Sequence, residues 1–563
     1  MAEQPTDWDD DCDLLVAGSG AAGLTAALAA ARQGLKVILC EKAHVLGGTT
    51  AWSGGWIWAP CNPVARRHGF DEDTSGPRRY LEAVQGNTFN AELVEAFLST
   101  APEMIGFLED AGLTFECGAG IPDTYGHLPG AGTGGRSVIA APFDGRALGP
   151  EIDRLRRPMR ETSFIGMTIQ AGADLRAFMT ATRSPRAALH VATRLGRHLW
   201  SLARHRRGMD LRNGNALVAR LMQAALAAKV DLRTDAAITA LELHDGRIIS
   251  ATVNGSRRIR AARGVVLACG GYPHDPARRD ATFPRARDHR TLAVDSAAGD
   301  GLRLGETAGG RQATTLAAPG AWCPVSSVTW PDGTTGTFPH IIDRGKPGVI
   351  GVRRTGARFC NEGLGYHDYV QAMIEATPQD EPVQSWLVCD HRFIRRYGLG
   401  IVRPAPMPLS RWITSGYLTR AATIPELARA CGIDPEGLSQ TVATFNSGAA
   451  RGEDPEFGRG TTPYMRLQGD PTVTPNPCLA PIATGPFYAV RVIPGSFGTF
   501  AGLQTDGAAR VVDKDARPIP GLYAAGTDMA SVMGGHYPAG GINLGPALTF
   551  GYIAGRHAAR GAA

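Results

Sequence analysis

The N-terminal segment constrains the fold more than any other part of the sequence. An apolar run over residues 13–17 leads into a glycine-rich turn, an alanine-rich stretch continues to residue 34, and a second apolar run ends at Glu41. This order of strand, glycine turn, helix, strand and acid is typical of a Rossmann-like unit that binds a dinucleotide. The glycines let the backbone approach a pyrophosphate at the helix N-terminus, and the carboxylate accepts a hydrogen bond from a ribose hydroxyl. The predicted contacts are Gly18, Gly20, Ala22, Gly23 and Glu41.

A second run rich in glycine and hydroxyl side chains follows this unit, over residues 47–55. Such a run suits a flavin better than a nicotinamide, because the ribityl-pyrophosphate chain is long and needs many small hydrogen-bonding neighbours. The alternative is a flexible surface loop, but the position of the run next to the nucleotide motif favours the flavin. The residues of this segment predicted to bind FAD are Lys42, Gly48, Thr49, Thr50, Ser53, Gly54 and Gly55.

Related patterns return far downstream and indicate a nucleotide domain built from both chain ends. Residues 230–243 are predicted to form a pair of strands, and residues 263–271 an apolar strand that closes in a glycine turn. Residues 520–528 form another apolar strand ending in a glycine and an acid, and a glycine run over residues 534–545 leads into a helix. The segment between these parts is therefore expected to be an insertion.

The chain of 563 residues is too long for one hydrophobic core, so at least two domains are expected. The predicted fold is α/β, with a Rossmann-like FAD-binding domain over residues 1–275 and 488–563. An α+β catalytic domain inserted over residues 276–487 is expected to cover the flavin and shape the substrate pocket. Further residues predicted to bind FAD are Ala237, Gly270, Asp300, Asp528, Ala547 and Leu548.

One basic segment accounts for the net positive charge of the whole chain. Residues 154–207 contain twelve arginines and two acids, a net of +10, whereas the whole chain carries +5. Apolar residues recur there every three or four positions and predict an amphipathic, arginine-rich helix from Arg186 to Arg207. This excursion, at about residues 150–210, either lies in a membrane interface or packs on the protein with a solvated basic face. Nucleic-acid binding is disfavoured, because no aromatic and basic platform accompanies the arginines. The apolar residues are Leu189, Ala192, Leu195, Leu199 and Leu202.

The cysteines and the N-terminus indicate the compartment. Ten cysteines are scattered singly, without a CxxC pair or a histidine cluster, which argues against zinc and against a disulfide scaffold. The first residues are acidic where a secretory signal would be basic and then apolar. No strongly apolar stretch is long enough to span a membrane. We therefore expect a cytoplasmic protein without a metal, with peripheral association with the inner face of the cell membrane as the added alternative.

Three motifs give the sequence a family resemblance. They are Pro122–Gly130 with Gly135-Arg-Ser after it, Arg358–Tyr366, and Tyr537–Leu548, which reads Tyr-Pro-Ala-Gly-Gly-Ile-Asn-Leu-Gly-Pro-Ala-Leu. With these, the chain resembles the fumarate reductase/succinate dehydrogenase flavoprotein superfamily over nearly its whole length. Within that superfamily it is most similar to the 3-ketosteroid Δ1-dehydrogenases.

Departures from the superfamily patterns decide between its branches. Ile542 stands where the dicarboxylate-reducing members carry an arginine, and Tyr537 lies near the position of their histidine. Tyr366 and His367 replace the arginine that donates a proton to the dicarboxylate. Without these clamps a dianionic substrate is disfavoured. Members with covalent flavin carry a histidine where Gly48 stands, so the resemblance implies non-covalent FAD.

The resemblance also implies the roles of four residues. Tyr366 resembles the base that removes the proton next to the ketone, and Tyr125 lies close enough to share or relay that proton. The hydroxyl of Tyr537 and the backbone N–H of Gly541 polarise the ketone, while flavin N5 receives the hydride. A free phenol has a pKa of about 10, so Tyr366 is expected to have a depressed pKa or to lose its proton transiently, and activity should rise toward alkaline pH. Thr124 stands where the family often has a second tyrosine, which leaves the proton relay open.

The function expected from these observations is the FAD-dependent 1,2-desaturation of a 3-ketosteroid or another bulky cyclic ketone, with a quinone-type electron acceptor. Alternatives within the enzymes are desaturation of the 4,5 bond of a 3-ketosteroid, or oxidation of a simpler cyclic ketone. From a different class, the chain could be a flavin-carrying membrane electron-transfer subunit that docks through its arginine-rich helix.

Overall fold

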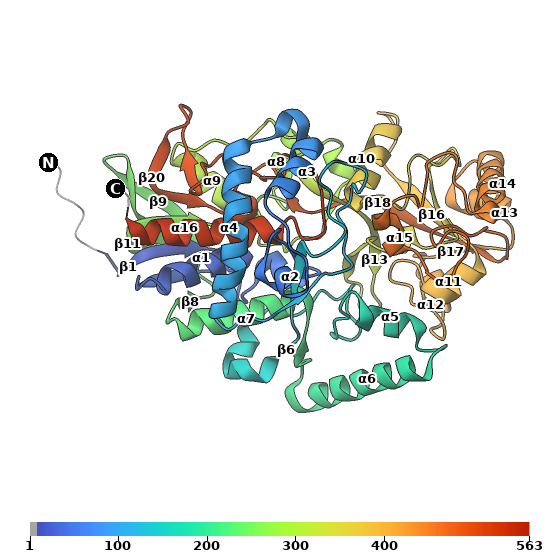
Figure 1. Ribbon diagram of the computed structural model, residues 1–563, viewed down its shortest axis with the longest axis horizontal. Helices are drawn as coiled ribbons and strands as arrows, with labels where there is room; N and C mark the ends of the chain where they lie inside the picture. The colour runs from blue at the N-terminus through green and yellow to red at the C-terminus, as the bar shows by residue number, and fades with distance from the viewer. Residues whose placement is uncertain (1–7, 562–563) are drawn as a thin grey trace.

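The computed structural model describes residues 8–561 and has two lobes, each built on its own β-sheet (Figure 1). The sheet of the first lobe follows the order β19-β20-β11-β1-β2-β8. In addition, β10 pairs with β11, and β9 pairs with β10. Its central strands are parallel, as β1 pairs in parallel with β2 and β11, and β11 with β20. The predicted α/β class is confirmed. The strands are β1 (Asp10–Ala17), β2 (Val37–Cys40), β8 (Asp231–Arg233), β9 (Ile238–His244), β10 (Arg247–Val253), β11 (Arg257–Leu267), β19 (Arg510–Val512) and β20 (Pro518–Ala524).

Small residues let two helices from opposite chain ends pack closely on this sheet. A side chain at Gly551 would place its Cβ 2.4 Å from the backbone oxygen of Ala22, and one at Gly555 would lie 2.4 Å from that of Ala26. The glycines and alanines therefore hold the N-terminal and C-terminal parts of the nucleotide unit together. The helices of this lobe are α1 (Ala21–Ala31), α4 (Ala91–Asp110), α7 (Asn213–Ala227), α9 (Asp300–Thr307) and α16 (Leu544–Arg560).

The second lobe contains a seven-stranded sheet of order β14-β13-β18-β16-β15, with β12 and β17 also paired to β18. Its long strand β18 (Phe487–Thr499) pairs antiparallel with β13 and β16, so this sheet extends past the predicted boundary at residue 487. The division of the chain into domains stays a prediction. The other strands are β12 (Arg290–Thr291), β13 (Gly320–Thr329), β14 (Thr335–Pro339), β15 (Val349–Val352), β16 (Ser385–Cys389) and β17 (Thr419–Ala421). The helices are α8 (Pro276–Thr282), α10 (Tyr366–Ala376), α11 (His391–Tyr397), α12 (Ser410–Thr414), α13 (Ile424–Cys431), α14 (Pro435–Arg451) and α15 (Pro463–Gln468).

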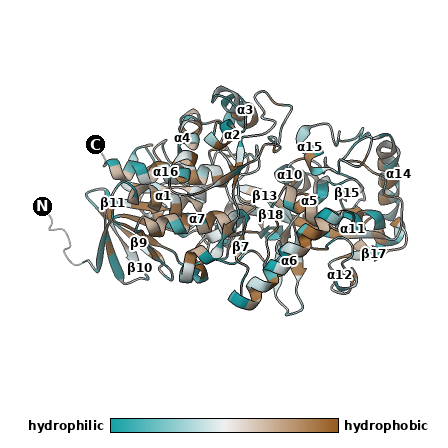
Figure 2. Ribbon diagram, turned by 60° about the horizontal axis from the view of Figure 1, so that its bottom comes forward, coloured by the Kyte–Doolittle hydropathy of each residue, from teal (hydrophilic) through white to brown (hydrophobic). Residues whose placement is uncertain are grey.

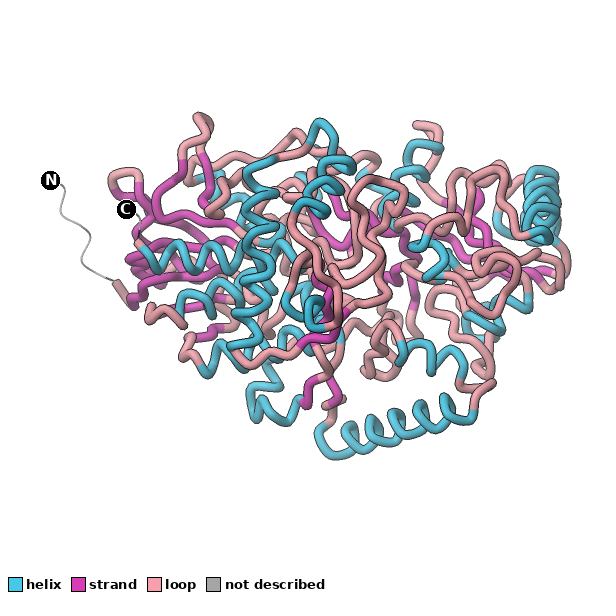
Figure 3. The backbone as a smooth tube through the Cα atoms, in the orientation of Figure 1, coloured by secondary structure: helices cyan, strands magenta, loops and turns pink. Residues whose placement is uncertain are grey.

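Loops and short elements fill the middle of the molecule between the two sheets (Figure 3). A small sheet of order β3-β5-β4 lies in this region, and β6 pairs with β7. The elements are η1 (Gly48–Trp52), β3 (Trp56–Trp58), α2 (Pro63–Arg67), α3 (Ser75–Gln85), β4 (Phe115–Cys117), β5 (Ser137–Ala140), β6 (Phe143–Asp144), η3 (Gly145–Arg154) and β7 (Asp210–Leu211).

The basic excursion forms α5 (Ala173–Thr180) and α6 (Pro185–His205), and α6 runs along the lower edge of the molecule (Figure 1). The buried residues of α6 are Ala187 and two polar residues, Arg194 and His198. Arg194 pairs with the buried Asp174, and Nε2 of His198 lies 2.9 Å from the backbone oxygen of Ile165. The helix is therefore held to the protein by a buried ion pair and a hydrogen bond to the backbone.

Hydrophobic and hydrophilic residues alternate along α6 (Figure 2), and several of the large hydrophobic ones are exposed. Leu189 is 70% exposed, Leu199 57% and Trp200 71%. As the alternative of a packed helix with a solvated basic face expects, Arg186, Arg197 and Arg204 are exposed, but Leu189, Leu199 and Trp200 also face solvent. Their orientation follows from Asp174, which draws an arginine inward and leaves the leucines outside.

All ten cysteines are free, and seven of them are buried. Within residues 8–561, no three His, Cys, Asp or Glu side chains are grouped so that they could hold a metal ion. No helix of the same residues is both long and apolar enough to cross a bilayer.

Candidate active site

The glycine turn between β1 and α1 is a backbone cradle that a side chain would fill. Gly18 has a φ of +102°, and a Cβ there would lie 2.2 Å from the backbone oxygen of Ala268. A Cβ on Gly23 would lie 1.9 Å from the oxygen of Gly18. Gly20 precedes the first residue of α1, so the free N–H groups of the helix face this turn. This geometry fits the pyrophosphate of a dinucleotide.

Glu41 lies at the end of β2, beside this turn. Its carboxylate accepts hydrogen bonds from the backbone N–H of Ser19 at 3.0 Å and from the Ser19 hydroxyl at 2.6 Å. The backbone N–H of Ala236 donates to the Glu41 carbonyl at 2.9 Å, which brings the neighbouring Ala237 to the same edge. The structure thus places Glu41 and Ala237 together at the predicted ribose end of the site.

The second glycine run turns back onto the start of α1. The hydroxyl of Thr50 accepts a hydrogen bond from the N–H of Ala21 at 3.0 Å, and that of Thr49 accepts one from Val294 at 3.2 Å. Ser53 donates to the carbonyl of Thr50 at 2.8 Å. This segment is therefore fixed against the nucleotide turn, and the alternative of a flexible surface loop is not what the structure shows.

Five more predicted FAD residues lie in this segment or contact it. Gly48 and Gly55 both have positive φ, +48° and +78°, and a Cβ on Gly54 would meet open space. Two of the predicted residues, Lys42 and Asp300, form an ion pair at 2.5 Å.

A cavity of about 340 Å³ lies where β20 ends and α16 begins. This edge is the carboxyl end of a parallel sheet, where nucleotide folds bind their ligands. Of the predicted residues, Ala547 lines the cavity, whereas Leu548 is buried in the hydrophobic core. The sequence analysis missed Thr499 and Phe500, which reach this cavity at and just after the end of β18.

Asp528 lies between two residues that line the same cavity. Its carboxylate accepts hydrogen bonds from the backbone N–H groups of Cys269 at 2.5 Å and Gly271 at 2.9 Å. Gly270 between them has a φ of +97°. Burial raises the pKa of Asp528 to about 6. The acid therefore joins the ends of β11 and β20 beneath the cavity.

The aromatic rings of Tyr366 and Tyr537 lie next to each other. Their centroids are 4.8 Å apart in an edge-to-face arrangement, and Phe497 lies 5.4 Å from Tyr366 on another side. The Nδ2 of Asn543 donates to the Tyr537 hydroxyl at 3.1 Å. Tyr366 is the first residue of α10, and Tyr537 belongs to the loop before α16, so the two lobes meet at this pair.

Gly541, four residues after Tyr537, is held by close backbone contacts with β3. It has a φ of +104°, a Cβ there would lie 2.6 Å from the Trp58 nitrogen, and its carbonyl accepts a hydrogen bond from the Trp58 N–H at 3.1 Å. Within the described part of the chain, the Gly541 N–H donates to no acceptor. The structure therefore supplies one free donor at the position predicted to polarise a ketone.

Tyr125 lies on a loop that is hydrogen-bonded to the segment containing Tyr537. The carbonyl of Pro538 accepts hydrogen bonds from the Thr124 N–H at 2.8 Å and from the Tyr80 hydroxyl at 2.6 Å. Tyr125 donates its hydroxyl proton to Asp368 at 2.8 Å. The sequence analysis missed this aspartate, which lies two positions after Tyr366 on α10.

A fourth tyrosine, Tyr464 on α15, was also missed. It lies close enough to Tyr125, Tyr366 and Tyr537 to raise the pKa of each of the three hydroxyls. Burial raises the pKa of Tyr464 itself to about 12. No local pattern in the sequence marks this residue, because it reaches the group from a short helix far along the chain.

The expectation of a depressed Tyr366 pKa is wrong for the resting site. Burial raises the pKa of Tyr366 well above its ordinary value, and the neighbouring Tyr537 raises it further. Burial also lowers the pKa of His367 to about 3, and His367 accepts a hydrogen bond from the Trp322 N–H at 3.2 Å. The hydroxyl of Tyr366 is therefore protonated at rest and beside a neutral imidazole.

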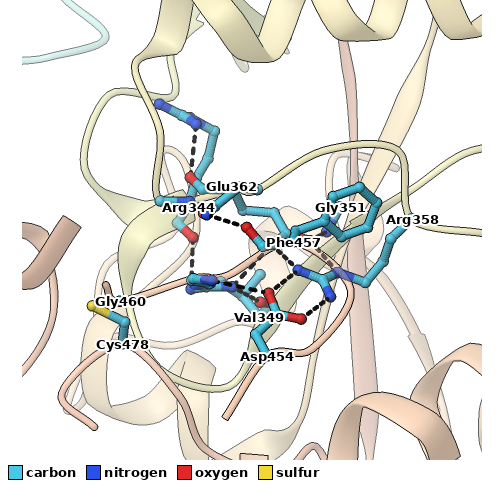
Figure 4. A network of polar contacts seen from close by, with 12 residues as sticks. Arg344, Val349, Gly351, Arg358, Glu362, Asp454, Phe457, Gly460 and Cys478 are labelled. Atoms are coloured by element: carbon cyan, nitrogen blue, oxygen red, sulfur yellow. Dashed lines mark hydrogen bonds and ion pairs between the residues drawn. The ribbon is translucent and has the colours of Figure 1, made fainter. Parts of the chain in front are cut away.

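A buried ionic network supports the segment that precedes Tyr366 (Figure 4). Arg358 contacts Glu362 at 2.7 Å and Asp454 at 2.8 Å, and Arg459 contacts Glu362 at 3.3 Å. Although burial acts against it, the two arginines hold the pKa of Glu362 below its ordinary value. Glu362 does not line the cavity at β20, so its contacts assign it to the packing of this segment.

Comparisons with known proteins agree with this site. Residues 13–544 match the FAD binding domain family. The chain is 40% identical to 4-oxocyclohex-2-ene-1-carboxylate 5-dehydrogenase of Sinomonas cyclohexanicum, over 98% of this chain and 94% of that protein. It is 35% identical to 3-oxosteroid 1-dehydrogenase of Mycolicibacterium smegmatis, over 96% of both.

A solved structure matches the whole molecule. The crystal structure of 3-ketosteroid Δ1-dehydrogenase from Sterolibacterium denitrificans in complex with 1,4-androstadiene-3,17-dione has a TM-score of 0.90 and 34% identity, covering 98% of this chain and 100% of that one. The glycine cradle, the acid at the end of β2 and these matches lead to one conclusion. The chain belongs to the FAD binding domain family, as an FAD-dependent oxidoreductase of the group that includes the 3-oxosteroid 1-dehydrogenases.

Proposed function

We propose that this enzyme desaturates the 1,2 bond of a 3-ketosteroid. The observation that carries the proposal is the pairing of Tyr366 and Tyr537, 4.8 Å between ring centroids, beside the free N–H of Gly541. Such an arrangement offers a hydroxyl base and two hydrogen-bond donors to one small region of a substrate. The similarity to named 3-oxosteroid 1-dehydrogenases supports the same reaction.

The donors act on the ketone oxygen. The Tyr537 hydroxyl and the Gly541 N–H bind this oxygen and stabilise the negative charge that develops on it as the neighbouring C–H bond breaks. Asn543 donates to the Tyr537 hydroxyl oxygen at 3.1 Å, which leaves the hydroxyl proton free to point at the ketone. These fixed donors make the proton next to the ketone acidic enough to be removed.

Tyr366 then takes that proton. Bound FAD would accept the hydride, with its electron pair, that leaves the adjacent carbon, and the electron pair of the first C–H bond forms the carbon–carbon double bond. Because burial keeps the Tyr366 hydroxyl protonated at rest, its proton must leave as the substrate proton arrives. The tyrosine cluster provides neighbouring hydroxyls for this transfer.

The surroundings of Tyr366 favour a hydrocarbon ring system. Tyr366 packs against a buried cluster formed by Met159, Leu292, Cys323 and Val325. These apolar side chains suit the fused rings of a steroid, which lose water without losing hydrogen bonds.

Turnover by the purified yellow holoenzyme tests the proposal. With 4-androstene-3,17-dione and an artificial electron acceptor, the product should be two mass units lighter with new vinyl signals at C1 and C2. Tyr537→Phe should retain FAD and lose turnover. Failure of any 3-ketosteroid to reduce the flavin under anaerobic conditions would overturn the steroid assignment, and vinyl signals at C4 instead would favour desaturation of the 4,5 bond.

A second candidate is oxidation of a smaller cyclic ketone. It is favoured by the 40% identity to an enzyme named for 4-oxocyclohex-2-ene-1-carboxylate, which exceeds the identity to the named steroid enzyme. The same assay with 4-oxocyclohexanecarboxylate decides between the two. A kcat/KM for this acid above that for the steroid would replace the first proposal.

We also infer that FAD is bound without a covalent link, because Gly48 offers no side-chain atom for one. Acid precipitation of the holoenzyme should leave the yellow colour in the supernatant. A yellow pellet would overturn this inference.

The outward face of α6 is the proposed contact with a membrane that carries anionic lipids. Its exposed Leu189, Leu199 and Trp200 form an apolar face, and Arg186, Arg197 and Arg204 add positive charge on the same helix. This combination is typical of helices that lie in a bilayer interface. A sterol-like substrate and a quinone-type electron acceptor both dissolve in such a bilayer.

Flotation with vesicles tests this contact. Trp200→Ser should reduce recovery with anionic vesicles several-fold, whereas Leu243→Ser, which replaces an exposed leucine on β9, should leave it unchanged. Equal recovery of both variants and the native enzyme would overturn the membrane contact.

If Tyr537→Phe kept both FAD and full turnover with a quinone, a role as an electron-transfer subunit would replace the dehydrogenase.

A further inference from the structure

Asp368 is a half-buried residue within the tyrosine cluster, and the mechanism above does not use its carboxyl group. Its Oδ1 accepts the hydroxyl proton of Tyr125 at 2.8 Å, and its Oδ2 is buried with no hydrogen-bond partner among the described residues. A side chain on Gly365 would place its Cβ 2.4 Å from this Oδ2. The glycine before Tyr366 therefore leaves room for an aspartate that has spare acceptor capacity.

The groups around Asp368 come from several elements and include one cation. Arg344 of η5 (Asp343–Gly345) acts on it from a distance, but its own N–H groups donate to the backbone oxygens of His340, Glu362 and Leu364. The other titratable groups that interact with Asp368 are Tyr80, Tyr125, Cys360 and Tyr464. No ion pair with Asp368 is formed within residues 8–561. A buried carboxylate without a counter-ion is costly and persists mainly at functional sites.

We propose that Asp368 accepts the proton that leaves the substrate, after transfer through the tyrosine hydroxyls. This inference rests on the proposed dehydrogenation. Tyr366 takes the substrate proton as it loses its own, one proton passes on through the hydroxyls of the cluster, and Tyr125 gives one to Oδ1 of Asp368, 2.8 Å away. Each hydroxyl gains and loses one proton, so the net change is one broken C–H bond and one neutral carboxyl group. The electron pair of the second broken C–H bond leaves separately with the hydride.

The acidity of the group suits this task. Burial raises the pKa of Asp368 to about 6, against the opposing effect of the Tyr125 hydrogen bond. The carboxylate is therefore ionised and able to accept a proton above this pH, and already protonated below it. Turnover should fall as the pH is lowered through about 6, because the acceptor is then occupied.

Asp368→Asn in the holoenzyme tests the inference, since asparagine can still accept the Tyr125 hydrogen bond but cannot be charged. With the substrate that the native enzyme oxidises best, kcat should fall about 100-fold at neutral pH, with little change in KM. The decline in kcat below about pH 6 should disappear. Glu375→Gln, the same replacement at an exposed position of α10, should keep both kcat and the pH profile.

The outcomes separate this inference from the proposed function. If the native enzyme oxidises no cyclic ketone, the proposed function fails. If it does, and Asp368→Asn keeps the acid decline, the inference is overturned. Should that variant lose FAD, Tyr125→Phe decides instead, because it keeps the carboxylate and removes the hydroxyl beside it: retention of native kcat would overturn the inference.

An infrared measurement provides a readout that is independent of turnover. The difference spectrum of the native holoenzyme between pH 5 and pH 8 should contain a carboxylic-acid C=O band that Asp368→Asn lacks. The same band in both proteins would assign it to another carboxyl group and overturn the titration of Asp368.

Discussion

Two carboxylates on one short segment, the fully buried Glu362 and the half-buried Asp368, have opposite surroundings. Glu362 is surrounded by donors, because Arg358 and Arg459 contact it and the Gly351 N–H donates to it at 3.0 Å. Asp368 accepts one hydrogen bond, from a tyrosine, and keeps one oxygen without a partner. The pKa of Glu362 is lowered and that of Asp368 is raised, so only Asp368 can change its charge near neutral pH.

The difference in pairing between these two carboxylates shows how one segment can serve both packing and chemistry. A fully paired carboxylate fixes the backbone, because removal of its charge leaves buried arginines uncompensated. A poorly paired carboxylate is costly to the fold but available to receive a proton. The segment before α10 is thus anchored at Glu362, and the exchangeable proton is placed at Asp368 in the first turn of the helix. The predictions below probe the two sides of this contrast.

The largest effect, a loss of stability, is expected when the fully paired Glu362 is replaced. Glu362→Gln removes the carboxylate that contacts Arg459 at 3.3 Å and leaves this fully buried guanidinium without an acidic partner, since its other acceptors are backbone oxygens. The free energy of unfolding should fall by about 3–5 kcal/mol. Denaturant titration of the holoenzyme measures it. Asp368→Asn should cause no such loss at neutral pH, because it removes an unpaired charge, and equal losses in both variants would contradict the contrast.

The second effect concerns catalysis. Tyr366→Phe removes the predicted base and should lower kcat by about 100-fold or more, equivalent to about 2.7 kcal/mol, with FAD still bound. Rapid-mixing measurement of flavin reduction reports the chemical step directly. Tyr417→Phe is the matched control, because it removes a buried hydroxyl bonded to Ser326 at 2.7 Å outside the tyrosine cluster. A similar loss of rate in both variants would show that Tyr366 acts only through packing.

Sequence patterns predicted the parts of the site that depend on local spacing. The glycine turn and Glu41 follow one another within one strand-helix-strand unit, so their meeting is fixed by short connections. Asp368 and Tyr464 could not be predicted in this way, because their roles depend on which distant loops pack against α10 and α15. Tyr125 was expected near the base, but its partner is an aspartate that no motif singled out.

Two further predictions depended on long-range packing. The apolar stripe of α6 was correctly located along the chain, but its direction depends on Asp174, which pairs with Arg194 from another helix. The predicted domain boundary at residue 487 falls at the start of β18, a strand that no sequence pattern had marked. Its hydrogen bonds to β13 and β16 place it in the other sheet.

The smallest effect concerns two histidines, His289 and His367, that burial keeps neutral. Burial lowers the pKa of His289 and of His367 to about 3, from an ordinary value of 6.5. Between these two pH values the unfolded chain binds a proton at each position and the folded protein does not. Stability is therefore fully present above pH 6.5 and is lost as the pH falls toward 3, by about 1.4 kcal/mol per pH unit for each histidine.

His289→Gln should flatten this dependence by about 1.4 kcal/mol per pH unit, since glutamine does not titrate and can still meet Ser496, which lies 3.0 Å from Nε2. Denaturant titrations at pH 6 and pH 5 measure the slope, and His44→Gln, at an exposed position, should leave it unchanged. An unchanged slope in His289→Gln would mean that this histidine is charged in the folded protein.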